Sequence, residues 1–196
     1  MEQKELEQLE HLAEQSLSKK RFQHVLNVRD QAVKLGKIHG ADLEKCRVAA
    51  LLHDITKELK FDNQLQIILK SDIMLSDIIL KSAPLYHAVT GSIYAKEELG
   101  ITDPDILNAI KYHTIGRAGM SKLEKIIYIA DATSADRTYK EVQRFRELSF
   151  ADLDNCMFEM VKHTIRYLVK DGCLLPSDTI DCYNELAASL HKQTGK

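Results

Sequence analysis

Apolar residues recur at helical spacing along most of the chain, and alternating strand patterns bounded by turn dipeptides are missing. The three prolines and most of the eight glycines lie between these amphipathic segments. A chain of 196 residues, 44% of them hydrophobic, is long enough to bury one substantial core. The sequence therefore predicts an all-α protein, built as a single irregular helical bundle without internal repeats or flexible linkers.

Capping signals locate several of the expected helices. Asp42 is a candidate N-cap, Thr102 and Asp105 resemble a capping box, and Ser121 with Glu124 forms a better one. That last cap favours a helix rather than a buried strand for the apolar run 126–129. A connection that carries Arg137, Arg144 and Arg146 is expected before the long helix 150–170. The expected helices cover residues 2–17, 18 to Gly36 or Gly40, 42–54, one or two short helices in 62–80, 84–100, 102–113, 121–131, 150–170 and 177 onward.

Charge and composition exclude several classes of protein. Lys and Arg total 27 against 29 Asp and Glu, which gives a net charge of -2 and makes nucleic acid an improbable main partner. No apolar run approaches the roughly 18 residues that a membrane span needs. The four scattered cysteines are interpreted as reduced thiols of a cytoplasmic protein, with a bridge between Cys173 and Cys182 left open.

Two aspartates stand in unusual places, because each closes an apolar helical run. The run 48–52 leads into His53 and Asp54, and the run 126–130 leads into Asp131. Burying a carboxylate costs free energy unless a cation, a metal or dense hydrogen bonding compensates it. Either aspartate could instead mark a helix that leaves the core with its carboxylate in water.

The His53-Asp54 step favours the metal interpretation. Adjacent helical residues point about 100° apart, so both can reach one ion beside the helix, and transition metals accept imidazole together with carboxylate. Helical bundles build such sites from side chains on facing helices. Three more histidines lie within other amphipathic segments: His24, His87 and His113. The other four are interpreted as structural: His11, His39, His163 and His191.

The strings around these residues resemble the bacterial HD-domain family of symmetrical bis(5'-nucleosyl)-tetraphosphatases, which cleave diadenosine tetraphosphate into two ADP. The order of His24, His53-Asp54 and Asp131 is similar to the H…HD…D signature of the HD metal-dependent phosphohydrolases. The more specific strings are RFQHV (21–25), LLHDITK (51–57), HAVTG (87–91), HTIG (113–116) and MSKLEKIIYIAD (120–131). The resemblance covers about 18–185 and implies one HD-type helical domain over 1–196, with helical extensions at both ends.

This resemblance implies a two-metal hydrolase of phosphoric anhydrides. Asp54 would bridge the metals, with His24, His53 and Asp131 completing one site. His87 and His113 would complete the other. Iron is the first expectation and manganese the second, since such ligands suit them better than magnesium. A hydroxide held between the metals would attack the phosphate.

The substrate is a polyanion, so cationic groups are expected beside the metals. Lys57, one turn beyond His53, and Arg137, six residues beyond Asp131, are the candidates, with Lys57 also assigned to catalysis. Thr114 is a further candidate, since Thr114, Gly116 and Gly119 could form a loop whose backbone amides approach phosphate. Surface charge and a plain turn are the alternatives. The stretch ATSADR (132–137) departs from the acidic, proline-containing stretch that the family commonly has, which leaves the substrate preference open.

Two other functions remain open at this point. The same metal site could act on a guanosine alarmone, a deoxynucleotide or a cyclic nucleotide. A non-catalytic module that binds metal or nucleotide is the other, although such a module would be expected to have lost some ligands. The amphipathic first and last helices would permit a homodimer.

Overall fold

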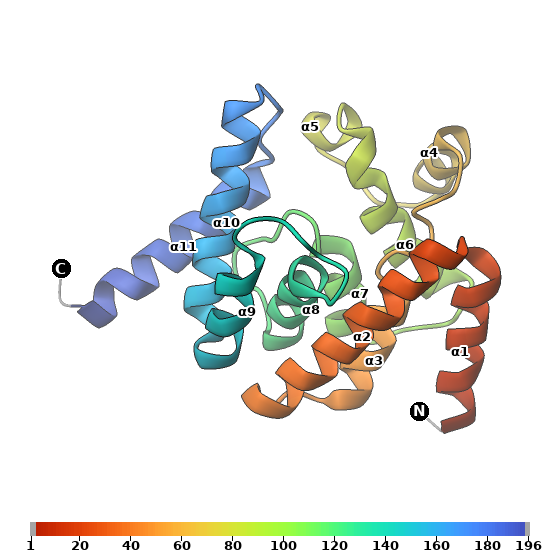
Figure 1. Ribbon diagram of the computed structural model, residues 1–196. Helices are drawn as coiled ribbons and strands as arrows, with labels where there is room; N and C mark the ends of the chain where they lie inside the picture. The colour runs from red at the N-terminus through yellow and green to blue at the C-terminus, as the bar shows by residue number, and fades with distance from the viewer. Residues whose placement is uncertain (1–2, 195–196) are drawn as a thin grey trace.

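The computed structural model describes residues 3–194, and all regular structure within this range is helical (Figure 1), which confirms the all-α prediction. The elements in chain order are α1 (Gln3–Ser16), α2 (Lys19–His39), α3 (Leu43–Leu52), α4 (Phe61–Lys70), α5 (Asp77–Leu80), the 3₁₀ turn η1 (Ala83–Leu85), α6 (Tyr86–Glu97), α7 (Pro104–Tyr112), α8 (Lys122–Thr133), α9 (Val142–Ala151), α10 (Leu153–Lys170) and α11 (Ser177–Thr194). No helix in this range is both long enough and apolar enough to cross a bilayer.

Side-chain caps fix the starts of α3 and α8, the helices that lead into the two unusual aspartates. Asp42 accepts hydrogen bonds from the amides of Glu44 and Lys45 at 2.9 and 3.1 Å. Ser121 and Glu124 form the predicted capping box. Of the two candidate stops for α2, Gly40 is the one used. It has φ 66°, a left-handed conformation that glycine adopts at little cost.

Two predictions at helix boundaries were wrong. The N-cap of α7 is Asp103 rather than Thr102, and its carboxylate accepts from the amide of Asp105 at 2.9 Å. The helix expected over 150–170 begins later, because Asp152 takes an extended conformation and caps α10. A separate helix, α9, precedes it, so Arg144 and Arg146 of the expected connection lie on a helix of their own.

The segment that contains Pro84 also differs from the prediction. Pro84 lies in the 3₁₀ turn before α6, so the α-helix itself begins at Tyr86 and ends at Glu97. Residues 62–80 form two helices, α4 and α5, as one of the predicted options had it. The four cysteines are free thiols, which closes the option of a bridge between Cys173 and Cys182.

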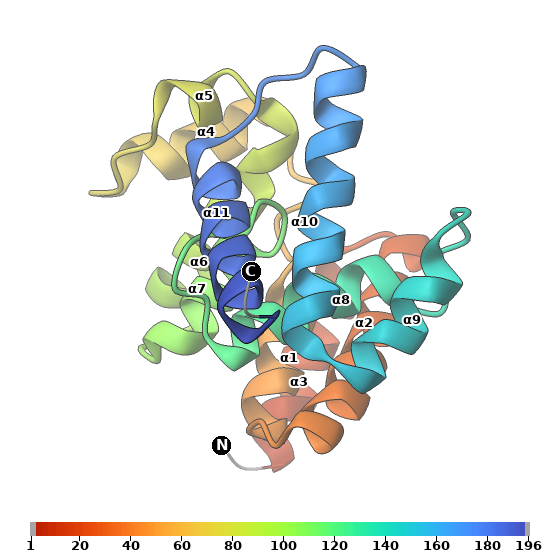
Figure 2. The same ribbon diagram turned by 90° about the vertical axis from the view of Figure 1, so that its left-hand side faces the viewer.

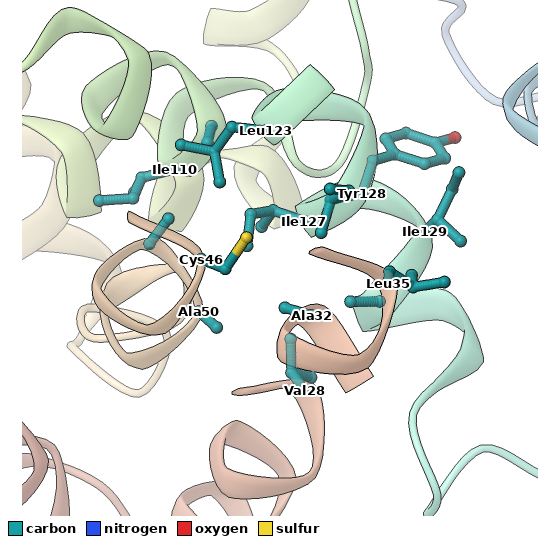
Figure 3. Packing of buried hydrophobic residues seen from close by; sticks show 14 of the residues in the cluster. Val28, Ala32, Leu35, Cys46, Ala50, Ile110, Leu123, Ile127, Tyr128 and Ile129 are labelled. Carbon is teal, nitrogen blue, oxygen red and sulfur yellow. The ribbon is translucent and has the colours of Figure 1, made fainter. Parts of the chain in front are cut away.

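Helix α8 lies at the centre of the core and contacts α2, α3, α7, α9 and α10. Its residues Ile126, Ile127 and Ile129 are fully buried, as expected for a helix that is surrounded by others. Figure 3 shows Cys46 of α3 and Ala32 of α2 packing beside the Ile127 side chain. This packing explains why the run 126–129 is apolar on all sides although it is a helix.

The remaining helices flank this core on two sides (Figures 1 and 2). Helix α10 packs on α8 and carries α11, while α6 packs on α7 and carries α4. A smaller apolar cluster, which includes Ile68, Ile79 and Tyr86, holds α4 and α5 against α6. The helices that bear the predicted metal ligands, α2, α3, α6, α7 and α8, therefore face one another in the middle of the molecule.

Candidate metal centre

The six predicted metal ligands meet at one point of the bundle. They come from α2, the end of α3, α6, the end of α7 and α8. Five are buried, and the sixth, Asp131, is half-buried. The six residues are His24, His53, Asp54, His87, His113 and Asp131.

The Asp54 carboxylate lies between two pairs of imidazoles. Its Oδ1 is 3.3 Å from Nε2 of His87 and 3.8 Å from Nε2 of His113. Its Oδ2 is 3.6 Å from Nε2 of His53 and 3.9 Å from Nε2 of His24. Each carboxylate oxygen thus faces one of the two ligand sets that the resemblance implies, which is the arrangement a bridging carboxylate needs.

Hydrogen bonds at Nδ1 orient the rings. Nδ1 of three of the histidines donates to the backbone carbonyl three residues earlier: His53 to Ala50 (2.7 Å), His87 to Pro84 (2.8 Å) and His113 to Ile110 (2.7 Å). These bonds fix the tautomer and leave the Nε2 lone pair directed at Asp54, as in histidines that bind metals. Nε2 of His24 and of His53 is buried and makes no hydrogen bond, a costly state that a bound cation would relieve.

His24 is oriented by a carboxylate instead of a carbonyl. Its Nδ1 donates to Oδ2 of Asp136 at 2.8 Å. Asp136 is held in turn by Asn27 at 3.1 Å and by Ser134 at 2.9 Å. Sequence reasoning gave Asp136 no role. The one available signal was its position in the loop after Asp131, where any acidic residue near a ligand is a candidate partner.

The donor atoms form two overlapping groups. Within the described residues, His24, His53 and Asp131 offer ligand atoms within 4.8 Å of one another, and so do His53, Asp54 and His113. The first group is one of the predicted ligand sets. His87 lies beside the second, with its Nε2 3.2 Å from Nε2 of His113. The residues present therefore fit the binding of a metal cation at this centre.

Electrostatics keep these groups in the protonation states that bind metals. Burial alone would raise the pKa of Asp54, but the charges of His53 and His113 outweigh it and lower the pKa to about 2. Burial, assisted by neighbouring imidazoles, lowers the pKa of His87 to about 3 and of His113 to about 4. At neutral pH the carboxylate is thus ionised and both rings are neutral.

His24 and Asp131 behave differently from His87 and His113. Burial opposes the charged form of both groups, but the attraction between the imidazole and the carboxylate outweighs it. It raises the pKa of His24 and lowers the pKa of Asp131, whose Oδ1 lies 3.0 Å from Nε2 of His24. Without a metal, His24 therefore binds a proton more readily than His87 or His113 does.

Three cationic side chains surround the centre. Nζ of Lys57 lies 3.1 and 3.2 Å from the ring nitrogens of His87, and burial lowers its pKa. Arg137 binds the Asp131 side chain and donates from Nε to its backbone carbonyl at 2.9 Å. Arg21 was missed as a site residue, although its Nη1 is 2.9 Å from Oδ2 of Asp54. Its place within the RFQHV string was the only signal.

Two cavities flank the centre. The larger, of about 1120 Å³, is lined by Lys19, Lys20, Arg21 and His24 among others. The smaller, of about 330 Å³, contains the predicted substrate contact Thr114, whose Oγ1 is buried without a hydrogen-bond partner. Arg137 and Tyr139 line both cavities. His163, interpreted as structural from the sequence, lies on the smaller one.

The expectation that Gly116 and Gly119 offer amides to phosphate was wrong. The amide of Gly116 donates to the carbonyl of Tyr112 at 2.8 Å, and that of Gly119 donates to Glu185 at 2.5 Å. Both donors are therefore used within the protein. Gly116 instead packs closely on α10 and α11, where an added Cβ would lie 3.2 Å from Met157 and from Cys182.

Comparisons with known proteins agree with this geometry. The model of the HD domain family matches residues 21–136, which contain all six predicted ligands. A relative from Halalkalibacterium halodurans, named symmetrical bis(5'-nucleosyl)-tetraphosphatase, is 35% identical over 89% of this chain and 93% of its own length. Relatives of the same name from Bacillus subtilis and Staphylococcus aureus are 35% and 33% identical over 89% and 91% of this chain, and over 93% of their own lengths.

A solved structure has the same fold. The crystal structure of a protein from Clostridium acetobutylicum, described as a predicted HD superfamily hydrolase involved in NAD metabolism, is 37% identical. It superimposes with a TM-score of 0.90 over 93% of this chain and 97% of that one. The helical arrangement around the centre is therefore shared with an HD superfamily protein.

Proposed function

The chain belongs to the symmetrical bis(5'-nucleosyl)-tetraphosphatases of the HD domain family, and from this premise we propose that it splits diadenosine tetraphosphate into two ADP. The observation that carries this proposal is the Asp54 carboxylate, which lies between two pairs of imidazoles whose Nε2 atoms face it. That arrangement suits hydrolysis of a phosphoric anhydride, for which two cations close together are a common catalytic device.

Two metal ions complete the site in this proposal. His24, His53 and Asp131 would hold one, His87 and His113 the other, and Asp54 both. Iron is the first choice and manganese the second, because four imidazoles with two carboxylates suit these metals better than magnesium, which prefers oxygen ligands and water. When bound, the metals supply Lewis acidity and lower the pKa of water at the site.

The cationic side chains would bind the phosphate chain. Lys57 lies against His87, so its ammonium is placed to neutralise a phosphate oxygen next to that ligand. Arg21 and Arg137 pair with Asp54 and Asp131, and their guanidinium groups are the nearest bidentate partners for further phosphate oxygens. Thr114 offers a free hydroxyl at the same edge of the centre.

A product analysis tests the function. The protein is purified anaerobically, its metal content is measured, and the products from diadenosine tetraphosphate are separated by chromatography. ADP as sole product supports the proposal, whereas AMP with ATP would refute symmetrical cleavage. A guanosine alarmone, a deoxynucleoside triphosphate and a cyclic nucleotide are run alongside, and faster turnover of any of them would reassign the substrate. A fully metallated protein that hydrolyses none of them would be a binding module.

Three further expectations belong to the same proposal. We propose that the chain works as a single HD-type unit over residues 1–196, since elements beyond residue 136 line both cavities. The free thiols support a cytoplasmic location. The exposed side chains of Val169 on α10 and Ile180 on α11 support a homodimer through the C-terminal helices, which sedimentation at rising concentration tests.

A further inference from the structure

The smaller cavity is built by two different parts of the chain. Its inner wall comes from the metal centre, through His113 and Asp131, with Thr114 beside them. Its outer wall lies entirely beyond residue 136, where the match to the HD domain model ends. These outer residues are Arg137, Tyr139, Phe145, Met160, His163 and Thr164. The part of the chain that follows residue 136 thus forms a cavity wall next to the metal centre.

The outer wall is aromatic. The rings of Tyr139, Phe145 and His163 form a cluster, with centroids 5.7 to 6.3 Å apart. Phe145 is buried, Tyr139 is half-buried and His163 is exposed at the rim. Apart from the ligand Asp131, the cavity is lined by no carboxylate. Such a wall suits a flat, uncharged aromatic group.

Polar groups in the cavity have hydrogen-bonding capacity to offer. Thr114 Oγ1 is buried and makes no hydrogen bond. On the other side, the hydroxyls of Tyr128 and Thr164 lie 3.2 Å apart and either can donate to the other. A buried hydroxyl without a partner is costly, so Thr114 is best explained by a polar group of a ligand.

From these observations we propose that the smaller cavity binds the nucleoside of one half of the substrate, with the base against Tyr139 and His163. This proposal rests on the proposed function and adds to it a subsite. The volume of about 330 Å³ is at the lower limit of small-molecule sites, which suits one nucleoside and excludes a whole dinucleotide. Arg137 lines this cavity and the larger basic one, so the phosphate chain passes beside it.

The test uses ADP, the product of symmetrical cleavage, and inorganic pyrophosphate, which has no base. Both are titrated calorimetrically into the metal-loaded protein. Stacking of a base on an aromatic side chain changes affinity by roughly 5- to 150-fold, so the His163→Ala variant should lose about 10-fold in ADP affinity and much less in pyrophosphate affinity. Thr164→Phe, which fills the cavity, should do the same. Tyr167→Ala, an exposed residue one turn further along α10, should change neither.

The outcomes separate the subsite from the function. Wild-type protein that binds ADP no more tightly than pyrophosphate would overturn the subsite, and so would a His163→Ala variant with unchanged ADP affinity. Because His163 is exposed, this variant should fold even if Thr164→Phe does not. Selective loss of ADP affinity in a protein that fails to split diadenosine tetraphosphate would retain the subsite and refute the proposed substrate.

Discussion

Replacing Asp136 by Asn should weaken one metal site and spare the other. Asp136 contacts His24 alone among the predicted ligands, through the 2.8 Å bond to Nδ1. The variant keeps the shape of the side chain but removes the charge that makes the imidazole a stronger ligand. The other three rings donate to backbone carbonyls, which the substitution does not touch.

The size of the expected loss in metal affinity follows from the solvent exposure of Asp136. Removing a hydrogen-bond partner of a ligand usually costs about 10- to 100-fold in metal affinity. The Asp136 side chain is 37% exposed, so solvent screens its charge and the lower end applies. We expect a loss of about 10-fold, or about 1.4 kcal/mol, at the site of His24, His53 and Asp131.

Competition against a chromophoric chelator measures this loss under anaerobic conditions. The wild-type protein should hold two metals, and the Asp136→Asn variant should release one at a chelator concentration about tenfold lower while the second stays bound. The matched control is Asp72→Asn, the same charge change at an exposed residue between α4 and α5. Equal weakening of both sites, or an unchanged titration, would refute the assignment of Asp136 as a partner of His24.

Four further outcomes are expected. Asp54→Ala should lose bound metal and hydrolysis together, and normal turnover in this variant would contradict the bridging role. Lys57→Ala should lower turnover while metal content, measured by elemental analysis, is retained; equal metal loss would show that Lys57 supports the ligands instead. Arg117→Ala should lower the unfolding free energy by about 3 kcal/mol in urea titrations, because the buried Glu124 carboxylate loses the two guanidinium nitrogens that lie 2.6 and 2.8 Å from it. The control is Arg144→Ala, which removes an exposed arginine paired with Glu159 and should lower the unfolding free energy by less than about 1 kcal/mol. In the metal-free protein, the pKa values of His87 and His113 are lowered to about 3 and 4, so below pH 6.5 the unfolded chain binds more protons than the folded protein. The free energy of unfolding should therefore fall from pH 6 to pH 4, and His113→Asn should make that fall smaller.

The sequence predicted the metal centre better than its surroundings. His53 and Asp54 are adjacent at the end of an apolar run, and Asp131 closes another, while His24, His87 and His113 lie within amphipathic segments. The resemblance to the HD phosphohydrolases then joined these six residues into one ligand set. Asp136 gives no such signal, since it meets His24 across 112 positions of sequence through a loop whose path depends on tertiary packing. The smaller cavity could not be predicted from the sequence either, because its lining also depends on tertiary packing.

The predictions of helix boundaries were wrong at the starts of α7 and α10. Thr102 and Asp103 are neighbours with similar capping ability, and the carboxylate of Asp103 gains an ion pair with Lys45 at 2.7 Å that no local rule includes. The break between α9 and α10 depends on one extended residue, Asp152, in a stretch whose helical propensity is otherwise continuous.

The carbonyl acceptors of His53, His87 and His113 have one more consequence. Every residue has a main-chain oxygen whatever its side chain, so Ala50, Pro84 and Ile110 can be replaced during evolution without changing the orientation of these rings. What must persist is the local turn of backbone that presents each oxygen. Mutational drift is thus tolerated beside three ligands, whereas a residue that unwinds any of those turns would release the ring it anchors.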